Sequence, residues 1–214
     1  PDDKWGDFIN VNVSIQFFCY FMLLALIEPL KYDIPMHIIK NSIRIGLRTW
    51  LGCEALDFEM DPRGILPKDI EKDINDIIPF ILVFITGHEF AHHLLGHCNK
   101  NNLKSIIMWG NDEKNSQKIY NSSQKEEFDA DLGSLEIPKY PDHVYEKVFE
   151  SSLIWFLIVD LVEYAMNLIN PGSFEGYQTH PIAMDRFKHI IKDAKHTKHF
   201  AEQPYKALIE WSTE

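Results

Sequence analysis

The sequence predicts a single, mostly α-helical domain with at most a small β-sheet or hairpin. The chain has 214 residues, 45% of them hydrophobic and 25% charged, which are the size and composition of one globular domain. Most apolar residues fall in long runs or recur at helical spacing. Only residues 103–109 carry a pattern typical of a strand.

The N-terminal part is expected to form two helices followed by a loop. The first covers residues 12–30 and ends near Pro29, because proline cannot continue a helix. The second covers residues 35–51 and starts with Pro35 in its first turn, where the missing N–H costs nothing. Residues 57–67 contain both Pro and Gly and are expected to form a loop.

The middle of the chain is expected to contain two helices and the strand. A charged amphipathic helix covers residues 68–76, and Pro79 is expected to kink or restart the chain. A strongly apolar helix follows over residues 80–97. With the strand at residues 103–109, a small hairpin is expected within residues 103–120.

The C-terminal part is expected to be helical. Ser123 and Glu126 fit a capping box, which predicts a helix over residues 124–135. Further helices are expected at residues 142–169, 181–195 and 200–211.

Charge and cysteine content limit the class of protein. The 21 Lys and Arg against 32 Asp and Glu give a net charge of −11, which argues against a nucleic-acid partner. The three Cys form no C-x-x-C pair, and the acidic N-terminus does not resemble a signal peptide. We therefore expect a cytoplasmic protein.

The alternative is a membrane-associated protein. Apolar runs occur at residues 17–27, 77–85 and 153–159. Each is well short of the roughly 20 residues that a helix needs to cross a bilayer. We therefore expect three helices buried in a soluble core, with membrane association as the second interpretation.

Residues 88–92 read H-E-x-x-H and fall in a predicted helix. Side chains four residues apart share one helix face, so His88 and His92 can bind one ion. Glu89 lies beside them, in the position of a general base for a zinc hydrolase. The apolar residues before this motif predict a buried helix, where unpartnered imidazoles would be costly and a metal ion would offset that cost.

Catalytic zinc usually takes three protein ligands, and the third is expected from the next helix. His93 and His97 point away from the face of His88 and His92, with His97 roughly opposite His88, so neither should reach the ion. Glu127 is the best candidate ligand. Asp131 lies one turn later on the same face, where it can accept a hydrogen bond from the outer N–H of a ligand histidine.

Three segments together resemble a known family. The segments HEFAHHLLGH, EFDAD and Thr179-His180-Pro181, with Arg186 five residues after Pro181, are similar to the gluzincin metallopeptidases of the HtpX and prenyl-protein-protease type. The small phage-exclusion or bacterial-defence metallopeptidases, which share the chemistry, are an alternative. The resemblance leaves the first 75 residues unmatched.

The resemblance implies a zincin-like domain with one zinc ion per chain, held by His88, His92 and Glu127. Glu89 would be the general base, and Asp131 would support a ligand histidine. His180, before a helix start, could donate a hydrogen bond to the oxyanion, as could Tyr177, while Arg186 would pair with a carboxylate near the site.

The sequence thus predicts a zinc-dependent endopeptidase that acts on a protein or peptide. The whole chain, residues 1–214, would be one metallopeptidase domain, with a helical part at 1–75 and the catalytic part at 76–214. The alternative function is an inactive binding or regulatory domain that uses the metal only for stability.

Overall fold

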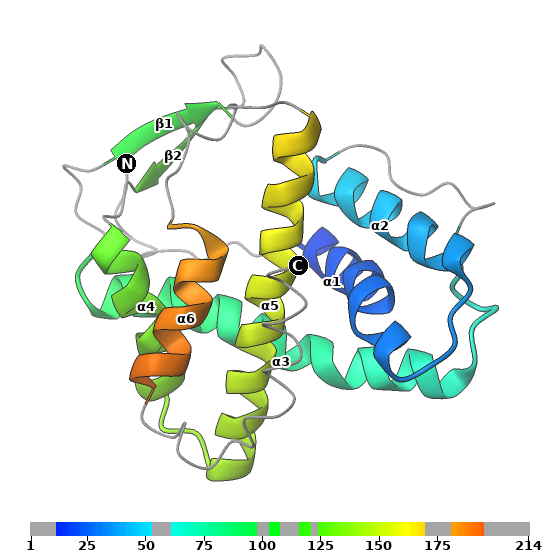
Figure 1. Ribbon diagram of the computed structural model, residues 1–214. Helices are drawn as coiled ribbons and strands as arrows, with labels where there is room; N and C mark the ends of the chain where they lie inside the picture. The colour runs from blue at the N-terminus through cyan, green and yellow to red at the C-terminus, as the bar shows by residue number, and fades with distance from the viewer. Residues whose placement is uncertain are drawn as a thin grey trace.

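The computed structural model describes residues 12–52, 61–97, 103–107, 116–120, 124–169 and 181–194. Within these ranges the chain is mostly helical, so the predicted fold class is confirmed. A long helix, α5, crosses the middle of the molecule, with α1 and α2 on one side and α4 and α6 on the other (Figure 1). The predicted terminal helix at 200–211 lies outside the described residues.

The first apolar cluster forms around α1 (Ser14–Leu26), which is buried along most of its length. It packs chiefly against α2 (Met36–Trp50), and the first half of α3 and the second half of α5 complete the cluster. The first helix ends before the predicted residue 30. The last residues of the predicted helix form a separate 3₁₀ turn, η1 (Glu28–Leu30), because Pro29 cannot donate the next α-helical hydrogen bond.

Helix α3 (Lys68–Leu94) is continuous over 27 residues, so the predicted restart of the chain at Pro79 is wrong. Pro79 removes one backbone hydrogen bond, but it lies on the exposed face of the helix. On the opposite face Ile74, Ile78 and Ile81 are buried in the first cluster. Their burial offsets the lost hydrogen bond, since each such side chain contributes about 1.5–3 kcal/mol.

The second apolar cluster lies between the second half of α3, α4 (Gln124–Glu136), α5 (Asp142–Ile169) and α6 (Ala183–Asp193). Phe84 of α3 meets Phe156 of α5 edge-on, with ring centroids 5.5 Å apart. Phe149 and Phe187 are also buried there. This cluster fixes α4 and α6 against the C-terminal half of α3, where the H-E-x-x-H motif lies.

The predicted hairpin is present. Strand β1 (Leu103–Ile107) pairs antiparallel with β2 (Ser116–Tyr120), with Leu103 opposite Tyr120 and Ile107 opposite Ser116. It connects α3 to α4 in the chain (Figure 1).

Two helices, α3 and α5, are long and apolar enough to cross a membrane by length and composition alone. The sequence predicts shorter apolar segments because it counts only unbroken runs, whereas the helices extend past them at both ends. A third of each apolar window is buried inside the protein. Core helices of soluble proteins pass the same test, so this finding does not assign a location.

Helices α3 and α4 cross closely at two glycines. A Cβ atom added to Gly133 would lie 2.9 Å from the Cβ of Ala91, and one added to Gly87 would lie 3.3 Å from the Cβ of Ser134. The first distance is shorter than two carbon atoms tolerate. This crossing brings the acidic residues of α4 to the histidines of α3.

We expect Gly133→Val to lower the free energy of unfolding by about 1–3 kcal/mol, because the added methyl groups force the two helices apart. Urea denaturation would measure the change. Lys125→Val, at an exposed position of the same helix, is the control and should change stability by less than about 0.7 kcal/mol. An equal effect of the two substitutions would contradict the close crossing.

Candidate metal centre

The last two turns of α3 present two imidazoles side by side. His88 and His92 are one helical turn apart, and their Nε2 atoms lie 3.0 Å from each other. Both side chains are buried, with 7% and 8% of their surface exposed. Helical spacing alone sets this arrangement, which is the one that the H-E-x-x-H pattern predicts.

Glu127 approaches the same point from α4. Its carboxylate oxygens lie 3.4 Å from the Nε2 atom of His88 and 3.3 Å from that of His92. The three donor atoms lie within 4.8 Å of one another. In the ranges that the structure describes, this is the one group of three or more His, Cys, Asp or Glu residues that could hold a metal ion.

The spacing of the donors fits a tetrahedral metal ion. Zinc binds imidazole nitrogen and carboxylate oxygen at about 2.0–2.2 Å, so neighbouring ligand atoms of a tetrahedron should lie about 3.3–3.5 Å apart. The distances from His88 and His92 to Glu127 end on different carboxylate oxygens, Oε2 and Oε1, and each agrees with that edge length. The distance between the two histidines is slightly shorter. A set of two histidines and one glutamate is also a known ligand set of catalytic zinc.

Asp131 supports His88 from behind. It follows Glu127 by one turn of α4, is fully buried, and its Oδ1 atom lies 2.9 Å from Nδ1 of His88. Since Nε2 of the same ring faces Glu127, this contact orients the imidazole toward the donor group.

Arg186 of α6 holds Asp131 in turn. Its Nε donates to Oδ2 at 2.8 Å and its terminal nitrogen to Oδ1 at 2.5 Å, a bidentate pair. The guanidinium also lies over the ring of Phe156, 4.8 Å from the centroid. The residue sits 55 positions after Asp131 in the chain, so only the packing of α6 on α4 brings the two together.

The electrostatics of the centre favour a cation. Burial alone would lower the pKa of His88, but its contacts with Asp131 and Glu127 outweigh burial and raise that pKa to about 9. Burial acts to raise the pKa of Asp131, yet the hydrogen bonds from Arg186 and His88 hold it below its ordinary value. Because Arg186 neutralises Asp131, the buried carboxylate of Glu127 leaves a net negative charge that a metal ion or a proton can balance.

His97 lies where the sequence did not predict it. The expected position, roughly opposite His88, assumed that the helix continues to residue 97, but α3 ends at Leu94. The chain then turns back, and Nδ1 of His97 lies 3.1 Å from Nδ1 of His92. His97 is not one of the three residues of the donor group. Gly96, which is common just after a helix end, is the sequence signal for this turn.

The remaining predicted site residues divide into two sets. Glu89 and His93 are exposed on α3, and Glu89 follows directly after His88 of the donor group. His180 and Tyr177 lie outside the described residues, so their predicted positions at the oxyanion stay predictions.

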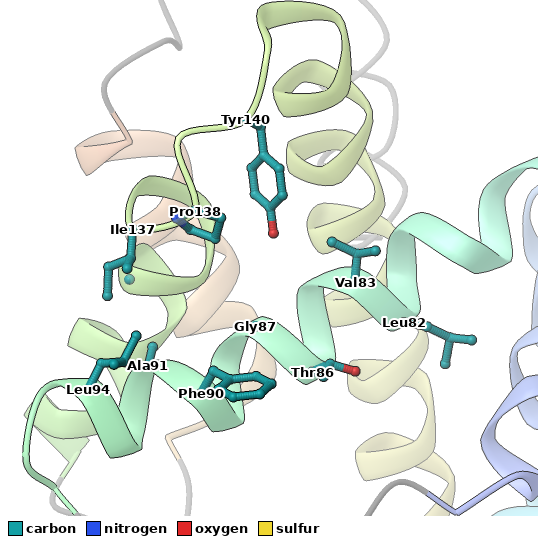
Figure 2. A pocket seen from close by; sticks show the side chains of 11 residues that line it. Leu82, Val83, Thr86, Gly87, Phe90, Ala91, Leu94, Ile137, Pro138 and Tyr140 are labelled. Carbon is teal, nitrogen blue, oxygen red and sulfur yellow. The ribbon is translucent and has the colours of Figure 1, made fainter. Parts of the chain in front are cut away.

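An apolar groove of about 460 Å³ runs along the reverse face of α3. Its wall includes Val83, Phe90 and Leu94 of α3, and Ile137 and Tyr140 from the segment after α4 (Figure 2). Phe90 is half exposed, whereas His88 and His92 on the opposite side of the helix are buried. The groove is therefore separate from the donor group of His88, His92 and Glu127.

Comparisons with protein-family models, with curated proteins and with solved structures find no match to this chain.

Proposed function

We propose that the protein is a zinc-dependent endopeptidase. The observation that carries the proposal is the convergence of His88, His92 and Glu127 at the spacing of a tetrahedral zinc site. Two features support it. Glu89, the residue that H-E-x-x-H enzymes use as a general base, is exposed next to His88. The order of the three motifs resembles that of the gluzincin peptidases.

His88, His92 and Glu127 would hold the ion. When bound there, zinc would supply Lewis acidity toward a carbonyl group and a water molecule. Glu89 takes the proton of the attacking water and later delivers it to the leaving amine. Asp131 and Arg186 keep His88 oriented, while His180 is proposed to donate a hydrogen bond to the oxyanion.

The metal centre is tested by binding. We expect one Zn²⁺ per chain, and a zinc concentration 100-fold above Kd should raise the free energy of unfolding by about 2.7 kcal/mol. His88→Ala should remove both the bound metal and the stabilisation. His93→Ala, which removes an exposed imidazole from the same helix, is the matched control and should keep both. Wild-type protein without bound zinc would contradict the proposal.

Cleavage is tested separately. Incubation with an unfolded protein, followed by mass spectrometry of the products, should show cuts at internal peptide bonds that stop with a chelator and resume with zinc. One bound zinc without any cleavage would instead favour the inactive binding or regulatory domain.

A further inference from the structure

The C-terminal end of α3 forms a tight reversal of the backbone. The N–H of His97 donates to the carbonyl of His92 at 2.9 Å, and the N–H of Gly96 donates to the carbonyl of His93 at 3.1 Å. Gly96 has a φ of +76°, in the left-handed region. This pair of bonds is a Schellman motif, and it fixes the direction of the chain just after the helix.

The reversal places the ring of His97 against the ring of His92. The two centroids are 5.2 Å apart and the rings meet edge to face at 69°. Their Nδ1 atoms are 3.1 Å apart, within hydrogen-bond distance. The turn is held by backbone hydrogen bonds that do not involve the side chain of His97. A different side chain at position 97 is therefore compatible with the same turn.

The direction of this hydrogen bond follows from the metal site. The Nε2 atom of His92 faces Nε2 of His88 and the carboxylate of Glu127, so its lone pair must be available to the ion. The proton of a neutral His92 is then on Nδ1. With a metal ion on Nε2, Nδ1 of His92 would donate this hydrogen bond and Nδ1 of His97 would accept it.

The two ligand histidines are therefore supported differently. His88 has a carboxylate behind it, Asp131, which Arg186 fixes. Among the contacts described for Nδ1 of His92, the partner is the imidazole of His97. Outer partners of this kind set the tautomer and orientation of a ligand ring, and losing one typically costs 10- to 100-fold in metal affinity.

We propose that His97 is a positioning residue, which accepts a hydrogen bond from His92 and so holds that ring in its metal-binding tautomer. The proposal rests on the metal site of the proposed function. It gives a role to the histidine that follows the H-E-x-x-H motif by five residues. Gly96 contributes by allowing the turn that places His97 beside His92.

A matched pair of variants tests the proposal. His97→Asn keeps an acceptor, Oδ1, in the place of Nδ1, whereas His97→Leu has nearly the same shape without one. We expect His97→Leu to weaken zinc binding by about 10- to 100-fold, and His97→Asn to retain most of the affinity. Competition with a chromophoric chelator measures the affinity. The absorption spectrum of the Co²⁺-substituted protein should change in the Leu variant only, which a purely structural role would not produce.

Two controls separate the causes. His93→Leu, at the exposed neighbouring histidine, should leave affinity and spectrum unchanged. The thermal midpoints of the metal-free proteins should be similar, since the side chain of His97 is outside the apolar clusters. Nitrogen-15 NMR of zinc-loaded wild-type protein should show a proton on Nδ1 of His92 and none on Nδ1 of His97, a measurement that needs no variant.

The possible results are distinct. Equal affinity of wild type and His97→Leu, equal loss in the Asn and Leu variants, or a proton on Nδ1 of His97 would each overturn the role of His97 and leave the metal centre standing. Failure of wild-type protein to bind zinc would overturn the metal centre and this role with it. Loss in the Leu variant alone supports the proposal.

Discussion

Glu89→Gln is expected to lower the rate of peptide cleavage by about 10²- to 10⁴-fold while zinc binding is retained. The amide of Gln has the shape of the carboxylate but cannot take a proton from water. Glu89 is exposed and is not among the three donor residues, so the substitution should leave fold and metal content unchanged. Cleavage of a fluorogenic peptide substrate identified by the digestion experiment measures the rate.

Two comparisons make this result interpretable. Glu126→Gln removes a carboxylate from α4, next to the proposed ligand Glu127 in sequence. It leaves the motif of α3 intact and should keep most of the activity. If Glu89→Gln cleaved at the wild-type rate, the general-base mechanism would be wrong, whereas metal binding by the protein would be unaffected.

Arg186→Met should lower the free energy of unfolding of the metal-free protein by about 3–5 kcal/mol. Asp131 is fully buried, and the substitution removes its bidentate partner and leaves its charge without that compensation. Because the Met side chain keeps much of the apolar stem, the loss reports mainly on charge. Chemical denaturation measures the change.

The control for this prediction is Lys188→Met, which removes an exposed positive charge from the same helix and should change stability by less than about 0.5 kcal/mol. Adding Asp131→Asn to Arg186→Met should restore part of the lost stability, since it removes the unpaired charge. A loss no larger than that of Lys188→Met would show that the ion pair does not stabilise the fold.

The parts of the fold that could be predicted are those that depend on local sequence patterns. The helices at 142–169 and 124–136 follow from apolar spacing, a capping box and prolines that mark helix ends, and all of these signals act within a few residues. The continuity of α3 through Pro79 could not be predicted in this way. It depends on what the neighbouring isoleucines contact, and those contacts come from α1 and α5, which are distant in sequence.

The candidate site divides in the same manner. His88 with His92, and Glu127 with Asp131, are pairs four residues apart, so a helix alone puts each pair on one face. Bringing the two pairs together requires the close crossing at Gly87 and Gly133. The position of His97 was missed because helical geometry was extended past Leu94, where Gly96 reverses the chain.

The continuity of α3 has a thermodynamic consequence. Its first half packs in one apolar cluster, and its second half packs in the other and carries the two histidines of the candidate metal site. Because no turn divides the helix, local unfolding of the first cluster and loss of structure at the candidate metal site are coupled. Substitutions that loosen the α1–α2 region would therefore raise the zinc concentration needed to load the site, and zinc would in turn suppress local opening of residues that it does not touch.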